Sequence, residues 1–364
     1  MELNKIRMIV VSDIHFGKKD DKHLFEELQS ELIPKINSDL DLFVIAGDLF
    51  DRVVKLNEMT SIYVFKFIDQ LVKLSKIYDF KIRILKGTKT HDFNQLQNFK
   101  GYEDDEDRFG IAEEVCEEEI FKGMQVLYVP EEYIENPDDY YNEYFNNKYD
   151  MIFFHGTMDF AGFASHIKED KSLKHAPNFK SDQIASLVKG VAIGGHIHIK
   201  QSYNNKIYYT GSFSRFNFGE SEDKGFYYVT FDPITKNTKL EFIKNTKAPE
   251  YVTINLNDLK GTLEEKLKGI EMLKEEYKNI RIDVTESEQN SNETVIEAIK
   301  NLTDDSVKLK VNNSFKEVYD SQYDFILKKE LSLEETIKKY VQMTKNKNLD
   351  VQNIKKIITE TDGD

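Results

Sequence analysis

The stretch RMIVVSDIH (residues 7–15) joins a continuous apolar run to an aspartate and a histidine. The same order recurs in LFVIAGDLFD (42–51), IRILKGTKTHD (82–92), MIFFHG (151–156) and VAIGGHIH (191–198). Continuous apolar runs are typical of strands that are buried on both faces of a sheet. In an α/β sheet, ligands and catalytic groups gather at the carboxyl ends of such strands. The sequence therefore predicts one site, built from the aspartates and histidines that follow these strands.

Helix-like stretches between the apolar runs predict a layered α/β domain over residues 1–245. Apolar residues repeat at helical spacing in 23–36 and 59–77. Strand, helix, strand, helix and strand patterns then follow one another in 246–318, which predicts a small α+β domain. Residues 319–364 are expected to be a linker and a tail with two short amphipathic helices.

Composition limits the class of protein. The chain has 364 residues, a formal net charge of −15 and one cysteine, Cys116. No apolar stretch of the sequence approaches the roughly 20 residues of a membrane span, so we expect no membrane association. A single cysteine excludes a disulfide framework and a thiolate metal site, which favours a reducing, intracellular compartment. The negative charge disfavours broad adhesion to nucleic acid, but bound divalent cations would offset carboxylates locally.

The residue types at the strand ends suit two metal ions. Nitrogen and oxygen ligands without sulfur fit Mn, Fe or Zn. The candidate ligands are too many for one open site and about right for two ions that share a carboxylate: Asp13, His15, Asp48, His155, His196 and His198. Asp48 is the expected bridge, because a carboxylate can use two oxygens on two metals. Two such ions, about 3.5–4 Å apart, activate a water and stabilise the oxygens of a phosphoryl displacement.

Taken together, these motifs resemble those of the calcineurin-like metallophosphoesterases. The signature of that family is D-x-H, GD-x-x-D, GN-H-D/E, an isolated H and G-H-x-H. The counterparts in this chain are Asp13/His15, Gly47/Asp48/Asp51, His91/Asp92, His155 and Gly195/His196/His198. The resemblance covers residues 7 to about 200 and implies a four-layer αββα sandwich that holds two metal ions.

The segment TGSFSRFNFGE (210–220) is similar to the GS-x-x-R-x-x-FGE segment of the SbcD/Mre11 nucleases. This resemblance implies a DNA exonuclease and endonuclease subunit that acts as a homodimer in the cytoplasm of a bacterial or phage-infected cell. It also implies a DNA-binding cap in 246–318 and tail helices that bind an SbcC/Rad50-like ABC-type ATPase. Family precedent favours Mn2+, with Mg2+, Fe2+ or Zn2+ as alternatives. No Walker A sequence occurs in the chain, so that partner would bind the ATP.

The resemblance assigns a role to each strand-end residue. The two ions would share one carboxylate, with one held by Asp13, His15, Asp48 and His198 and the other by Asp48, His155 and His196. His91 would be the catalytic histidine that protonates the leaving oxygen or orients the scissile phosphate. Asp51 and Asp92 would bind a metal or brace a ligand or a turn.

The stretch LKGTKTHD (85–92) departs from the family pattern. Three residues, Thr88, Lys89 and Thr90, stand where the family has one asparagine. That asparagine is normally a ligand of the second metal, and Thr90 could offer a hydroxyl in its place. Because a neutral hydroxyl is a poor replacement, we expect the second ion to bind more weakly.

Several alternatives stay open at this stage. Arg215 and Glu220 would form a salt bridge that fixes a turn, or contact DNA or a second subunit. The 59–77 helix would pack in the core or join a homodimer bundle. The remaining histidines, His23, His166 and His175, are expected to be structural or surface residues. The whole chain would be the nuclease subunit, a stand-alone metallophosphoesterase for small phosphate esters, cyclic nucleotides or phosphoprotein, or a non-catalytic scaffold for the ATPase.

Overall fold

The computed structural model describes residues 5–121, 123–161, 177–277, 279–285, 293–302 and 307–312. The helices expected in the tail at 319–364, together with His166 and His175, lie outside these residues. None of the helices in the described part of the chain combines the length and the apolar character that crossing a membrane requires.

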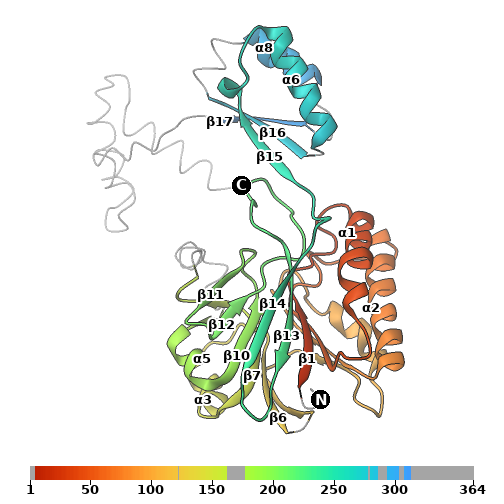
Figure 1. Cartoon of the computed structure of the whole chain (residues 1–364), viewed down its shortest axis with the longest axis vertical. Coiled ribbons are helices and arrows are strands. Elements are labelled where there is room, and N and C mark those ends of the chain that lie inside the picture. Colours follow the sequence, from red (N-terminus) through yellow and green to blue (C-terminus); the bar gives the residue numbers. More distant parts are fainter. Residues whose placement is uncertain are drawn as a thin grey trace, which may run out of the picture.

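Two six-stranded sheets, packed face to face, carry the strand-end motifs (Figure 1). The first sheet has the strand order β14 (Thr238–Lys244), β13 (Gly225–Phe231), β1 (Ile6–Val11), β2 (Leu42–Ala46), β3 (Lys81–Leu85) and β4 (Phe109–Ala112). The second has the order β11 (Gln201–Tyr203), β12 (Ile207–Tyr209), β10 (Val188–Gly195), β7 (Tyr149–His155), β6 (Met124–Val129) and β5 (Cys116–Ile120). Strands β1 to β4 are parallel to one another, as are β6, β7, β10 and β12. The apolar runs of each sheet therefore end at the same edge of that sheet.

Helices cover the outer face of each sheet and complete four layers (Figure 1). The covering helices are α1 (Asp21–Glu27) and α2 (Met59–Tyr78) on the first sheet, and α3 (Pro137–Phe145) and α5 (Ser181–Leu187) on the second. The sequence of β1 is almost entirely apolar because both faces of this strand are buried. Ile9 and Val11 pack beneath the helices, whereas Met8 and Val10 pack between the two sheets. The predicted αββα sandwich is confirmed.

The helix expected over 23–36 is divided in the structure. α1 ends at Glu27, a π-helical turn follows over Leu28–Leu32, and a 3-10 turn covers Ile33–Lys35. The break has a local cause, because Pro34 has no amide hydrogen to donate and cannot continue an α-helix. The shorter elements are a 3-10 helix at Gln95–Tyr102 and a parallel pair of strands, β8 (Thr157–Met158) and β9 (Asn178–Phe179).

A smaller unit follows the sandwich and has the expected order of elements (Figure 1). Its elements are β15 (Tyr251–Asn255), a 3-10 turn at Leu256–Asp258, α6 (Leu263–Glu276), β16 (Asn279–Thr285), α8 (Glu293–Leu302) and β17 (Val307–Asn312). Thr262 and Glu265 start α6 with a reciprocal capping box. The three strands are parallel, in the order β15–β16–β17, so strands and helices alternate instead of segregating as in an α+β unit.

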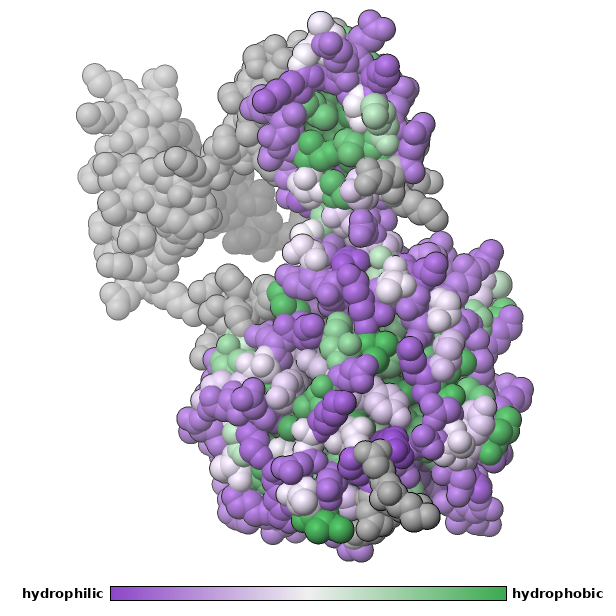
Figure 2. Space-filling model, viewed as in Figure 1, coloured by the Kyte–Doolittle hydropathy of each residue, from purple (hydrophilic) through white to green (hydrophobic). Residues whose placement is uncertain are grey.

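The two faces of the small sheet differ in character. Ile280, Ile282 and Val307 pack against the helices in a core of their own. A core of this size leaves part of its apolar surface uncovered, and hydrophobic side chains reach the surface of the unit in Figure 2. The other face carries polar and aromatic side chains, among them Tyr251 and Arg281, and it lies toward the sandwich, where Tyr251 contacts Lys19.

Replacing Phe153 by alanine should lower the free energy of unfolding by about 3–5 kcal/mol, because it would leave a cavity between the sheets. Phe153 is fully buried there and stacks on Tyr128, with ring centroids 5.8 Å apart. Urea unfolding followed by circular dichroism measures the loss. Ile234→Ala is the control: Ile234 is 74% exposed, so the change should stay within about 0.5 kcal/mol. A Phe153→Ala protein as stable as the wild type would contradict this packing.

Candidate metal centre

The structure brings the strand-end residues of both sheets together. Asp13 and His15 follow β1, Asp48 follows β2 and His91 follows β3 in the first sheet; His155 ends β7, and His196 and His198 follow β10 in the second. Nitrogen and carboxylate atoms of these residues form overlapping groups in which the potential ligand atoms lie within 4.8 Å of one another. The six candidate ligands and His91 therefore surround one site.

The first group contains Asp13, His15 and His198. The Nε2 atoms of His15 and His198 are 2.8 Å apart, and they lie 3.9 Å and 3.7 Å from Asp13 Oδ1. Asp51 fixes the His15 ring from behind, since its Oδ1 is 3.1 Å from His15 Nδ1 and also accepts a hydrogen bond from Lys18. Burial raises the pKa of Asp51, but these two partners lower it overall. Asp51 thus orients a candidate ligand.

Asp48 lies between the two halves of the site. Its Oδ2 is 2.9 Å from His91 Nδ1, 3.4 Å from His155 Nε2 and 3.8 Å from His15 Nε2. Burial raises the pKa of this carboxyl, and the surrounding His155, His91 and His15 lower it well below its usual value overall. A charged Asp48 with imidazoles on several sides is the arrangement that a bridging carboxylate requires.

The second group includes a residue that the sequence motifs did not reveal. Glu131, two residues beyond β6, is 1% exposed, and its Oε2 is 2.8 Å from His196 Nδ1 and 3.8 Å from His155 Nε2. It follows the apolar run MQVLYV (124–129), but the pair Pro130-Glu131 matches no family motif. The rule that polar residues collect at strand ends would have indicated Glu131.

The LKGTKTHD turn differs from expectation at Thr90, which is exposed. The amides of His91 and Asp92 both donate to the Thr88 carbonyl, at 2.8 Å and 3.0 Å, and this turn carries the intervening residues to the surface. Thr88 faces the site instead: its amide donates to Asp48 Oδ1 at 2.6 Å. Gly87 is required before it, because a Cβ there would lie 2.2 Å from the Asp48 amide nitrogen.

Asp92 braces the loops around Asp48. Its fully buried carboxylate accepts hydrogen bonds from the backbone amides of Asp48, Phe50 and Gly87, at 3.1, 3.0 and 2.7 Å. Burial, and then the Asp48 charge, raise the pKa of Asp92 to about 6. Both oxygens are already used by the backbone, so Asp92 holds the β2 and β3 loops together and is not a member of the ligand groups.

The backbone at the site is held in a costly conformation. Four candidate ligands have positive φ angles, at Asp13 (51°), His15 (55°), Asp48 (51°) and His196 (94°). Residues with a Cβ seldom adopt this region, and each such residue costs about 1–3 kcal/mol. Hydrogen bonds between the loops hold the conformation in place: the Asp13 amide donates to the Gly47 carbonyl and the His15 amide to the Asp48 carbonyl, each at 3.1 Å.

The chemistry of the donor set fits divalent cations. His155 Nδ1 donates to the Ala46 carbonyl at 2.7 Å, so Nε2 is the nitrogen that faces the site. That Nε2 is buried without a hydrogen-bond partner and lies among carboxylate oxygens. Burial lowers the pKa of His155, but Asp48, Asp13 and Glu131 raise it overall, to about 10. The site therefore favours positive charge, which a bound metal cation would supply in place of the proton. The residues present therefore fit metal ions.

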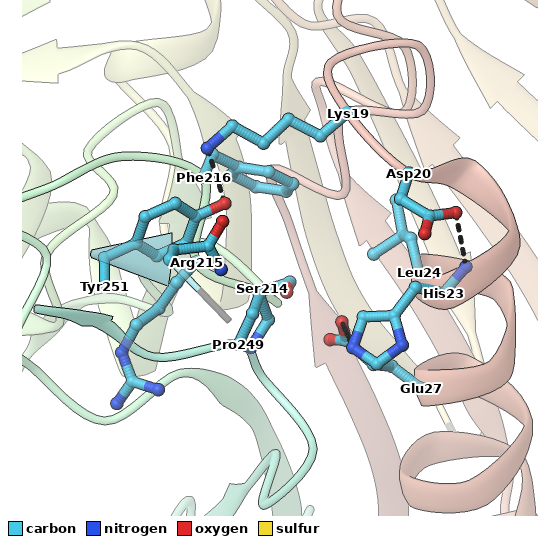
Figure 3. A pocket seen from close by; sticks show the side chains of 11 residues that line it. Lys19, Asp20, His23, Leu24, Glu27, Ser214, Arg215, Phe216, Pro249 and Tyr251 are labelled. Atoms are coloured by element: carbon cyan, nitrogen blue, oxygen red, sulfur yellow. Dashed lines mark hydrogen bonds and ion pairs between the residues drawn. The ribbon is translucent and has the colours of Figure 1, made fainter. Parts of the chain in front are cut away.

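Arg215 and Glu220 have separate structural partners. The Arg215 guanidinium donates to the carbonyls of Ala248 and Glu222, and in Figure 3 it points away from Lys19. Glu220 pairs with the buried Lys224 at 3.0 Å. The expected salt bridge therefore exists at Glu220 with a different cation, while Arg215 ties the segment to the start of the small unit.

Known proteins match more than half of the chain. Residues 6–200 match the family model described as calcineurin-like phosphoesterase. A relative from Invertebrate iridescent virus 6, named "Putative phosphoesterase 244L", is 27% identical over 264 residues, which cover 70% of this chain and 86% of that protein. The crystal structure of TT1561 of Thermus thermophilus is 10% identical, with a TM-score of 0.35, over 66% of this chain and 99% of that one. With more than half of the chain matched by the family model, the protein belongs to the calcineurin-like phosphoesterase family.

Proposed function

We propose that the chain is a metal-dependent DNA exonuclease and endonuclease subunit of an SbcCD/Mre11-Rad50-like complex. It would hydrolyse phosphodiester bonds at a two-ion site, with Mn2+ as the favoured metal, in DNA repair, recombination or replication. The tail at 319–364 would bind the ATPase partner. The observation that carries the proposal is the contact of one segment, Ser214–Glu222, with both the candidate metal centre and the small unit.

Two aromatic side chains of this segment make the connection. The Phe216 ring lies 5.5 Å from the His15 ring and 6.4 Å from the His198 ring, measured between centroids. Phe218 lies 5.1 Å from the ring of Tyr251, which begins the small sheet, and 5.1 Å from the guanidinium of Arg281. A substrate bound at the metals would therefore meet the small unit as it extends, which favours a polymer over a small ester.

Cations and aromatic rings gather along this path despite the negative net charge. Lys19 lies over the Tyr251 ring, 3.9 Å from its centroid, and both line a cavity of about 380 Å³ beside Phe216 (Figure 3). Partial removal from water, and then the nearby Lys308 charge, lower the pKa of Lys19 to about 8. Phosphate contacts from lysine and arginine supply most of the affinity for DNA, and aromatic rings stack on unpaired bases.

His91 is one of the more exposed histidines of the site. Its side chain is 28% exposed and that of the candidate ligand His198 is 26% exposed, whereas the His15 and His155 side chains are fully buried. With Nδ1 bonded to Asp48, the Nε2 of His91 is left to hold a proton for the leaving oxygen or to bond the scissile phosphate. Bound divalent ions would supply an activated water and neutralise charge on the phosphoryl oxygens.

An apolar surface on the first layer supports the proposed homodimer. Phe67 of α2 is fully buried, as core packing requires, but the start of the helix and the loop before it expose large apolar side chains. They are Val53, Leu56, Met59 and Ile62, which are 56, 71, 60 and 43% exposed. Exposed apolar residues so close in sequence are typical of an interface. A second copy of this chain is the occupant we propose.

His91→Ala should reduce Mn2+-dependent cleavage of a labelled DNA duplex by about 100- to 10,000-fold, the usual contribution of a general acid. Bound Mn2+ should be unchanged, because His91 is not among the expected metal ligands. The control is Ile234→Ala, at an exposed residue between β13 and β14, which should cleave like the wild type. A wild type that hydrolyses p-nitrophenyl phosphate esters but no DNA, even with the ATPase present, would refute the nuclease and favour the small-ester alternative.

The KM for DNA should rise as the pH increases from 7 to 9. Lys19, with a pKa of about 8, is charged below that pH and loses its positive charge above it. Lys19→Arg should remove the rise, because arginine stays charged throughout. KM for a p-nitrophenyl ester, which is too small to reach Lys19, provides the comparison. Equal pH profiles for wild type and Lys19→Arg would exclude Lys19 from DNA binding.

Leu56→Glu combined with Met59→Glu should convert a dimer into a monomer, because the charges would be buried in the interface. Size-exclusion chromatography with light scattering gives the mass directly. Ile234→Glu places the same charge on an equally exposed apolar residue elsewhere and should leave the dimer intact. A wild type that is monomeric at every accessible concentration would contradict the proposal.

A further inference from the structure

We infer that Glu131 is a direct metal ligand, which supplies a charged oxygen to the second ion where related sites use a neutral amide. The inference rests on the proposed two-ion site and adds a ligand to it. Glu131 follows β6, a strand with none of the motif residues at its end. The second ion would then have Glu131, His155 and His196 as ligands in addition to the shared Asp48.

The position of the Glu131 carboxylate is the first reason. Its Oε2 lies 2.8 Å from His196 Nδ1 and 3.8 Å from His155 Nε2, a buried nitrogen that has no hydrogen-bond partner. Thr88, which directly follows Gly87, donates its hydroxyl to the same oxygen at 3.2 Å. In related sites the asparagine that follows this glycine binds the second ion. In this chain Thr88 follows Gly87, and Glu131 Oε2 lies next to the Thr88 hydroxyl.

Hydrogen bonds to the other oxygen and to the backbone of Glu131 fix its orientation, so that Oε2 points into the site. Tyr133 donates its hydroxyl to the other oxygen, Oε1, at 2.5 Å. The Glu131 amide donates to the Lys86 carbonyl at 3.0 Å, which joins the end of β6 to the end of β3. A ligand held by its second oxygen and its backbone is pre-oriented, as carboxylates and histidines at metal sites commonly are.

Charge is the third reason. Glu131 is 1% exposed, and the groups around Oε2 in the described part of the chain are imidazoles and a hydroxyl. A buried carboxylate is stable only where positive charge faces it. A divalent ion at this place would supply that charge. An anionic ligand should also bind that ion tightly, which reverses the weak second site expected from the Thr88–Thr90 sequence.

A purely structural role is the competing explanation, in which Glu131 only hydrogen-bonds His196 and positions its ring. The two roles predict different responses to Glu131→Gln. If Glu131 is a ligand, the loss of its charge weakens the binding of one ion. If it only positions His196, glutamine still offers an oxygen that accepts the hydrogen bond, and both ions should bind as in the wild type.

The test compares Glu131→Gln with Glu132→Gln. Glutamine keeps the shape of the side chain and removes its charge. Glu132 is the neighbouring buried carboxylate and accepts its hydrogen bonds from Tyr140 and Val115, away from the histidines. Calorimetric titration with Mn2+ and metal analysis after dialysis give the number and affinity of bound ions. Thermal unfolding in EDTA and in Mn2+ gives the second readout.

Wild type and Glu132→Gln should each bind two ions per chain. Glu131→Gln should keep one ion at wild-type affinity and bind the other at least about 10-fold more weakly. It should also show a smaller rise of Tm with Mn2+ than the wild type. Two ions at wild-type affinity in Glu131→Gln would overturn this inference alone. A wild type that binds fewer than two ions would overturn the two-ion site as well.

Discussion

Asp48 keeps a negative charge inside the protein, and the surrounding loops are built around it. Imidazoles from both sheets approach its outer oxygen, while the Thr88 amide bonds the inner one. The Asp92 carboxylate accepts a hydrogen bond from the Asp48 backbone amide. A buried carboxylate is stable only with such partners. The ends of the strands and the turns of the loops must therefore place these partners around the Asp48 carboxylate.

Much of this could be predicted from the sequence, because burial on two faces leaves a continuous apolar run and the following residue is then at a sheet edge. Glu131 was missed because a proline and a glutamate after a strand form no recognisable pattern. Thr90 was preferred to Thr88 because the turn that buries one and exposes the other depends on backbone hydrogen bonds. The partners of Arg215 are carbonyl groups, which are present at every residue and give no sequence signal.

The segment Ser214–Glu222 contacts both the candidate metal centre and the small unit. Phe216 packs on the histidines, Phe218 packs on the small unit, and the buried Lys224 ties Glu220 to the His198 carbonyl. The segment therefore joins the two parts of the chain through aromatic and charged contacts. Family membership alone defines a phosphoesterase; this segment is where a preference among phosphate esters would arise.

Each sheet contributes about half of the candidate ligands, so the site spans the interface between two independent layers. Asp13 and Asp48 follow strands of the first sheet, whereas Glu131 follows and His155 ends a strand of the second. The apolar side chains between the sheets therefore set the ligand distances as well as the stability. A substitution there that shifts one layer by a fraction of an ångström would change the metal-binding geometry before it threatened the fold.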